Sequence, residues 1–138
     1  MSLETRKVVT NFLRYKDKIL ILRRSKTTKT YRGVWAGISG YIEKGDTSPK
    51  VRAEKEINEE VGLRKRDLKL VKIGNPLKIT EINKNIVWIV HPFLWDVSKD
   101  KLELDWEHDE AKWIFPEELA NFKTVPQLIE TLKKVLEF

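Results

Sequence analysis

The stretch from residue 48 to residue 62 constrains the fold most, because it carries the start, the apolar stripe and the end of one helix. Ser48 is of the type that caps helix N-termini, and Pro49 fits the first helical position. Gly62 suits the left-handed conformation that commonly ends a helix. At about 100° per residue, three apolar side chains share one stripe: Ala53, Ile57 and Val61. The pattern predicts a helix over residues 49–61 with one buried face.

Short apolar runs on both sides of this helix predict strands. Residues 5–24 have the pattern of a hairpin. Further strands are expected at residues 68–73, 77–82, 86–95, 101–104 and 112–115. Pro92 predicts that its strand is an edge strand or carries a bulge. A short helix is expected from Pro116, and a closing helix with Pro126 in its first turn. Strands mixed with helices indicate an α+β or α/β/α layered domain.

The length and composition exclude several classes of protein. A chain of 138 residues suits one domain over residues 1–138, and a hydrophobic share of 41% excludes a disordered chain. No run approaches the roughly 20 apolar residues of a membrane helix, and no signal peptide is present, so no membrane partner and a cytoplasmic location are expected. The absence of cysteine excludes disulfide scaffolds, zinc fingers and thiol catalysis, and two histidines are too few for a three-histidine metal site.

Positive charge is concentrated at the start of the chain. The net charge is +6, yet residues 1–32 hold ten Lys or Arg against only Glu4 and Asp17. Such a basic segment beside an acidic remainder suggests an anionic partner. Charge alone leaves nucleic acid, a small phosphate ester and plain solubility as open alternatives.

Three carboxylates of the predicted helix share one face. Glu56, Glu59 and Glu60 are spaced at i, i+3 and i+4, so they lie together and repel one another. Either they are well solvated or a cation lies among them. Mg²⁺ prefers such oxygen ligands and shares its coordination shell between carboxylates, waters and phosphates.

The surrounding sequence resembles a known family signature. Residues 40–63 read GYIEKGDTSPKVRAEKEINEEVGL, which resembles the Nudix hydrolase signature G-x5-E-x7-R-E-U-x-E-E-x-G-U, with U aliphatic. The opening glycine and most of the closing half match: Gly40, Glu56, Ile57, Glu59, Glu60, Gly62 and Leu63. Asp46 replaces a Glu, Lys55 replaces an Arg, and one extra residue falls in the turn at 47–49. Residues 35–40 and 107–113 are similar to the family's Trp-bearing lead-in and to its later acidic segment.

The resemblance implies an α/β fold, a Nudix-like α/β/α sandwich with a mixed β-sheet between helices. It implies hydrolysis of a nucleoside diphosphate linked to another moiety, with Mg²⁺ as cofactor and Mn²⁺ as the alternative. Carried over by position, the metal ligands are Glu56, Glu59, Glu60 and the Gly40 carbonyl. Glu56 and Glu107 are both candidates for the general base, and a surface carboxylate is the alternative for Glu107. Lys55 stands where an Arg holds the carboxylates of the signature in place.

Cationic and aromatic side chains before the signature are candidates for substrate binding. Four basic residues border the expected cleft: Arg23, Arg24, Lys29 and Arg32. Successive strand residues face opposite sides, so one of Arg23 and Arg24 is expected to face the site, with solvated charge as the alternative. Trp106 and Tyr31 are candidates for base stacking, although core packing also explains tryptophans. His108 either reaches a phosphate or is simply exposed in an acidic loop.

Two other functions stay open at this stage. The substitutions at Asp46 and Lys55 suit a nucleotide- or RNA-binding module of the same fold that has weak or no turnover. The sequence has no aromatic-rich RNA-binding motif, so a nucleic-acid partner is not expected, and the expected partner is a small-molecule nucleotide substrate. A homodimer is a further expectation from the resemblance. Arg52 is predicted to supply the planar fork that Lys55 lacks, since it precedes Glu56 by four residues on one helix face.

Overall fold

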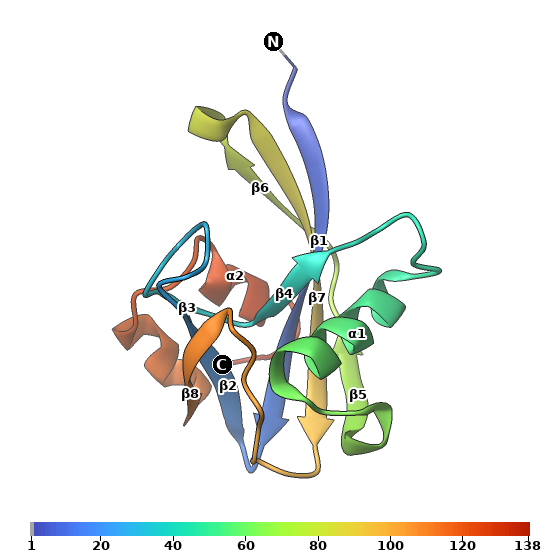
Figure 1. The fold of residues 1–138 in the computed structure, drawn as a ribbon, viewed down its shortest axis with the longest axis vertical. Helices are drawn as coiled ribbons and strands as arrows, with labels where there is room; N and C mark the ends of the chain where they lie inside the picture. The colour runs from blue at the N-terminus through green and yellow to red at the C-terminus, as the bar shows by residue number, and fades with distance from the viewer. Residues whose placement is uncertain (1) are drawn as a thin grey trace.

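A mixed sheet of eight strands forms the centre of the protein (Figure 1). The computed structural model describes residues 2–138. The strands are β1 (Glu4–Tyr15), β2 (Lys18–Arg24), β3 (Trp35–Ala36), β4 (Ile38–Tyr41), β5 (Leu68–Ile73), β6 (Leu77–Glu81), β7 (Ile86–Val97) and β8 (His108–Ile114). The helices are α1 (Pro49–Val61) and α2 (Leu128–Lys133), with short 3-10 helices η1 (Lys65–Asp67), η2 (Ile82–Lys84) and η3 (Pro116–Asn121).

The two strands of the predicted hairpin separate soon after their turn. β1 and β2 pair only at Arg14 with Ile19 and at Tyr15 with Lys18. Beyond that point β4 pairs with β1 and β3 pairs with β2, so the segment from β3 to β4 fills the split. β1 also pairs in parallel with β7 along nearly its whole length, whereas the other pairs are antiparallel. The split places β4 beside α1, where the site is built.

Helices cover both faces of the sheet, as the α/β prediction requires. α1 packs its Ala53–Ile57–Val61 stripe into a cluster with Val9 and Leu13 of β1. Phe12 of β1 points to the opposite face of the sheet, where it packs with residues of α2 and η3 in a second cluster. In Figure 1, α1 lies to the right of the centre of the sheet and α2 to its left. The predicted sandwich with a mixed sheet between helices is confirmed.

The ends of α1 follow from its capping residues. The Ser48 hydroxyl accepts a hydrogen bond from the Val51 amide at 3.3 Å, and Pro49 is the first helical residue. Gly62 ends the helix with φ at 77°, and its amide donates to the Asn58 carbonyl at 3.0 Å. The predicted bounds of residues 49–61 are confirmed.

One end of the sheet extends as an arm beyond the two helical layers, at the top of Figure 1. The arm consists of β6, the first half of β7 and the start of β1. β6 pairs with β7 from Leu77 opposite Val90 to Glu81 opposite Ile86, and Glu4 of β1 lies opposite Ile86 on the other side. The arm forms one wall of the cavity described below.

Three sequence expectations differ from the structure. Residues 101–104 form a loop, because Glu103 and Asp105 donate their amides to the Val61 and Glu60 carbonyls at the end of α1. α2 begins after Pro126, at Leu128, and is a short helix. Pro92 marks neither an edge strand nor a bulge: β7 is central, at Pro92 its second neighbour changes from β6 to β5, and the register shift of the β5–β7 pair lies further on, opposite Leu94 and Trp95. Within residues 2–138 no helix has the length and apolar character to cross a membrane.

Candidate active site

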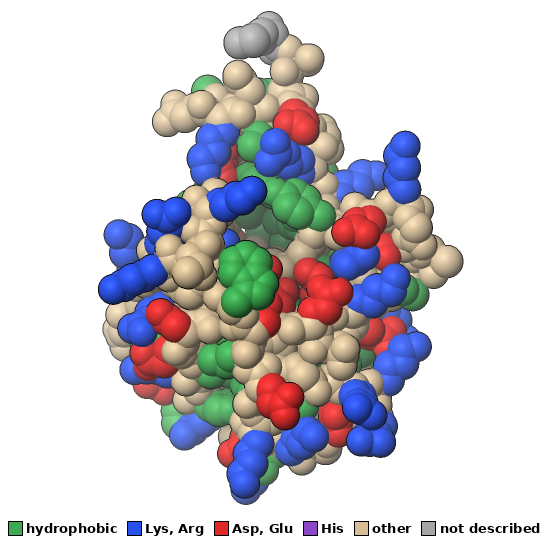
Figure 2. All heavy atoms as spheres, viewed as in Figure 1, with side chains coloured by type: hydrophobic (Ala, Val, Ile, Leu, Met, Phe, Trp, Pro, Cys, Tyr) green, Lys and Arg blue, Asp and Glu red, His purple; other side chains and the backbone are tan. Residues whose placement is uncertain are grey.

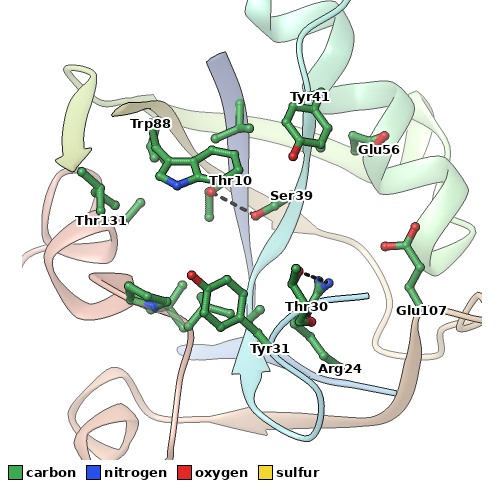
Figure 3. Close-up of a pocket in the computed structure, with 18 of the residues that line it drawn as sticks. Thr10, Arg24, Thr30, Tyr31, Ser39, Tyr41, Glu56, Trp88, Glu107 and Thr131 are labelled. Carbon is green, nitrogen blue, oxygen red and sulfur yellow. Dashed lines mark hydrogen bonds between the residues drawn. The ribbon is translucent and has the colours of Figure 1, made fainter. Parts of the chain in front are cut away.

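A cavity of about 610 Å³ opens between α1, β4, the arm, the loop after β2 and the start of α2. Its two halves differ in chemistry. The acidic half is lined by Glu56, Glu59, Glu107, Arg52 and Lys55, and the aromatic half by Tyr31, Tyr41, Trp88, Ile79 and Glu81. Figure 2 shows the hollow, with acidic side chains on one side and hydrophobic ones on another. Figure 3 shows Glu56 and Glu107 pointing into it from one side and Trp88 lying at the other.

Glu56 is the carboxylate of α1 most affected by its neighbours in the acidic half. Its side chain is 13% exposed. Burial, a hydrogen bond to Glu59 and the negative charges of Glu59 and Glu107 together raise the pKa of Glu56 to about 8, against an opposing effect of Arg52. This protein therefore gathers more negative charge here than its own cations offset.

Glu60 is buried behind Glu56, at the end of a short polar chain. Its Oε1 lies 3.6 Å from His108 Nε2, and His108 Nδ1 lies 3.0 Å from Asp105 Oδ1. Burial, followed by the charges of Glu56 and Glu107, raises the pKa of Glu60 well above its usual range. His108 is itself buried in β8, so neither of its expected roles, phosphate contact or an exposed loop position, matches its place.

The site has two features that fit a divalent cation. Glu60 Oε2 is buried and has no hydrogen-bond partner among the described residues, which is costly unless another group uses that oxygen. Gly40 packs so closely on α1 that a Cβ there would stand 2.5 Å from Glu56 Cγ. In residues 2–138 as they stand, no three Asp, Glu or His side chains already converge on one point as metal ligands. Carboxylate donors, an unused buried oxygen and a close backbone suit a hard cation.

Arg52 rather than Lys55 is the main cationic partner of these carboxylates. Arg52 donates to Asp46 through two nitrogens, from Nε to Oδ2 at 2.7 Å and from Nη2 to Oδ1 at 3.1 Å. It also lies 3.1 Å from Glu43 and 3.6 Å from Glu56. The Arg52 hydrogen bonds, with the Glu43 amide, lower the pKa of Asp46 to about 2. Lys55 reaches Asp46 at 3.4 Å from a half-exposed position.

The four basic residues suggested for substrate binding occupy different places. Arg24 lines the cavity, and its Nε donates to the Thr30 carbonyl at 2.9 Å (Figure 3). Arg23 points away from the cavity and pairs with Asp109 at 2.8 Å and with Glu110. Lys29 and Arg32 are exposed and lie outside the lining residues. Strand alternation therefore selects Arg24 from the pair.

The two candidates for base stacking also lie in different places. Tyr31 lines the cavity, whereas Trp106 is 66% exposed and lies outside the lining. Its carbonyl accepts a hydrogen bond from Ser25 Oγ at 2.8 Å, which fixes the loop that carries Glu107. Sequence reasoning missed Trp88 and Glu81, because only the pairing of β6 with β7 brings them to the cavity.

Comparison with known proteins places this geometry in a family. The family model for the NUDIX domain matches residues 4–135. The structure resembles a MutT protein from Methanosarcina mazei (22% identity, 98% of this chain and 95% of that chain, TM-score 0.76). It also resembles a C. elegans Ap4A hydrolase (19%, 94% and 93%, TM-score 0.73) and a NUDIX hydrolase from Nitrosomonas europaea (15%, 95% and 88%, TM-score 0.76). No curated protein matches the chain.

Proposed function

The chain belongs to the Nudix family, and on this premise we propose that it is a metal-dependent pyrophosphohydrolase acting on a nucleoside diphosphate linked to another moiety. The substrate class is a nucleotide or a nucleotide sugar. The observation that supports this most is the meeting of Glu56, Glu59 and Glu107 at one cavity, with Glu60 buried behind them. The cytoplasmic location and the homodimer expected from the sequence remain predictions.

The acidic half would hold the diphosphate and its counterion. Glu56, Glu59 and Glu60, with the Gly40 carbonyl, would hold Mg²⁺ or Mn²⁺. A bound divalent cation would supply positive charge that offsets the charge of the diphosphate. Arg24 would add a further cation at the cavity wall, where a guanidinium is suited to phosphate oxygens.

The attacking water needs a proton acceptor at the same place. Glu56 and Glu107 both point into the acidic half, so either would accept the proton as phosphorus is attacked (Figure 3). Arg52 would keep Glu56 in position through its side chain, which also holds Asp46 and Glu43. In this proposal Lys55 screens the buried carboxylate of Asp46 from an exposed position and does not orient the ligands.

Hydrolysis of a substrate panel tests the proposal. The panel holds ADP-ribose, nucleoside triphosphates, dinucleoside polyphosphates and sugar nucleotides, and release of a mononucleotide is measured with and without Mg²⁺. We expect Mg²⁺-dependent release by the wild type and a loss of at least about 100-fold in Glu59→Gln, because a metal ligand is removed. Glu54→Gln, on α1 beside Lys65 and outside this cavity, is the matched control. Equal rates in Glu59→Gln and the wild type would overturn the site.

A binding module with the same fold is the second candidate. The observation that favours it is Lys55 in place of the usual Arg. Arg52 weakens this alternative, since its fork already grips Asp46 and reaches Glu56. The same panel separates the two functions, because a binding module would retain nucleotide without releasing product.

A further inference from the structure

We propose that the aromatic half of the cavity binds a nucleobase that carries an exocyclic amino group, with Trp88 as the stacking surface and Glu81 as the hydrogen-bond acceptor. The inference rests on the proposed function, because it supposes that the diphosphate lies in the acidic half. It adds what that function leaves open, the part of the substrate that this chain selects.

The register of three strands presents the Trp88 indole to the cavity. Trp88 lies opposite Arg6 of β1 and opposite Ile79 of β6, at the middle of the arm. The Tyr41 ring lies beside it, with centroids 5.9 Å apart and planes at 34°. Tyr31, from the loop after β2, lies across the open space from Trp88 (Figure 3). Planar rings around an open slot suit a flat heterocycle, because aromatic faces stack on any base.

Glu81 gives this half its hydrogen-bonding preference. Its Oε1 accepts from the Tyr31 hydroxyl at 2.8 Å and from Trp88 Nε1 at 2.8 Å. Its Oε2 lies 3.4 Å from the Lys84 ammonium. Burial alone would raise the pKa of Glu81, but hydrogen bonds from Tyr31, Trp88 and Lys84 outweigh it and hold the pKa below its usual range. The carboxylate is therefore ionised and acts only as an acceptor.

An ionised acceptor discriminates between bases. A carboxylate has about four lone-pair positions, and the contacts of Glu81 leave room for one more donor from a ligand. Adenine, guanine and cytosine offer amino N–H groups to such an acceptor. Uracil offers only its N3–H on that edge, between two carbonyl oxygens that would meet the carboxylate with like partial charges, so uracil is disfavoured.

The wall between the two halves fits the sugar that joins base to phosphate. The Thr10 and Ser39 hydroxyls, opposite each other on β1 and β4, are hydrogen-bonded at 3.0 Å and line the cavity. Figure 3 shows them between Trp88 on one side and Glu56 on the other. Aromatic rings, hydroxyls and carboxylates therefore follow in the order of base, ribose and diphosphate.

Equilibrium binding of AMP and UMP to metal-free protein, by titration calorimetry, tests this site apart from catalysis. We expect AMP to bind the wild type at least about tenfold more tightly than UMP. Trp88→Leu should lose about tenfold or more in AMP affinity, and Trp88→Phe less, because phenylalanine keeps a stacking face. Glu81→Gln should reduce the preference for AMP over UMP, since an amide also offers donors to carbonyl edges. Circular dichroism and thermal unfolding confirm that each variant is folded.

Each outcome separates the inference from the proposed function. Equal AMP affinity in the wild type and a folded Trp88→Leu would overturn the base site, and so would a loss confined to Trp106→Leu. An AMP-to-UMP preference that survives unchanged in Glu81→Gln would overturn the role of Glu81. Selective AMP binding by a wild type that hydrolyses nothing on the panel would support the base site and refute the hydrolase.

Discussion

Replacing Gly40 with alanine tests how closely β4 packs on the acidic face of α1. The added Cβ would overlap the Glu56 carboxylate, with Oε1 as the nearest atom, and would stand 2.5 Å from Cγ, whereas ordinary contact begins at 3.4 Å. Glu56 must therefore move by more than about 1 Å or turn to another rotamer, and either change displaces its carboxylate. Because a misplacement of about 1 Å can cost about 100-fold in rate, we expect kcat/KM to fall about 100-fold, or about 2.7 kcal/mol.

The assay measures kcat/KM with saturating Mg²⁺ and, separately, the affinity for Mg²⁺ in Gly40→Ala. Gly45→Ala is the matched control, because a Cβ at Gly45 meets no atom within 4 Å and its backbone is unstrained. We expect wild-type kinetics and stability in the control, whereas Gly40→Ala should stay folded but lose about 1 kcal/mol or more of stability, because the added methyl group overpacks the Glu56 side chain. A Gly40→Ala enzyme with wild-type kcat/KM would refute the reasoning that Glu56 must stay where β4 leaves room for it.

Three further predictions concern charge in the acidic half. Arg52→Ala should lower kcat/KM about 10- to 100-fold, because Glu56 loses the side chain that holds it in position. Lys55→Arg should leave kcat/KM unchanged or slightly raised. Steady-state kinetics in which only Lys55→Arg has a large effect would contradict this prediction. Arg24→Ala should raise KM about tenfold at fixed ionic strength, and Arg23→Ala, directed away from the cavity, should not. Without metal, thermal stability should fall from about pH 6.5 to about pH 8, because folded Glu56, with its pKa raised from 4.5 to about 8, and the buried Glu60, whose pKa is also raised, keep protons that the unfolded chain has lost. Both histidines have pKa values lowered from 6.5, so near pH 6.5 the unfolded chain binds more protons at them and this offsets part of the fall; above about pH 7.5 they are largely neutral in both states, and a flat profile there would count against the raised pKa of Glu56.

Local signals in the sequence predicted α1 and its acidic face. Capping residues at both ends fixed the bounds of α1, because capping depends on neighbours within a few positions. The i, i+3, i+4 spacing of Glu56, Glu59 and Glu60 follows from helical geometry, so it predicted their shared face. It did not distinguish the cavity-lining Glu56 from the buried Glu60, since that depends on where β8 and its His108 pack.

Features that depend on long-range strand pairing could not be predicted from the sequence. The alternating Leu102 and Leu104 have a strand pattern, yet they pack on the core from a loop whose amides bond to the end of α1. Trp88 and Glu81 lie seven residues apart in the chain, and only the hairpin of β6 and β7 joins them in one hydrogen bond. Such contacts depend on the register of the paired strands, because a shift by one residue turns every side chain of a strand to the opposite face of the sheet.

Binding of Mg²⁺ to metal-free protein, measured by titration calorimetry, tests the central claim most directly: that the carboxylates of α1 hold a divalent cation. The wild type and Glu54→Gln should bind Mg²⁺ alike. Glu60→Gln should lose that binding while its folded state becomes more stable without metal, because a buried carboxylate oxygen with no partner is replaced by a neutral amide. Wild-type Mg²⁺ affinity in Glu60→Gln would contradict the account.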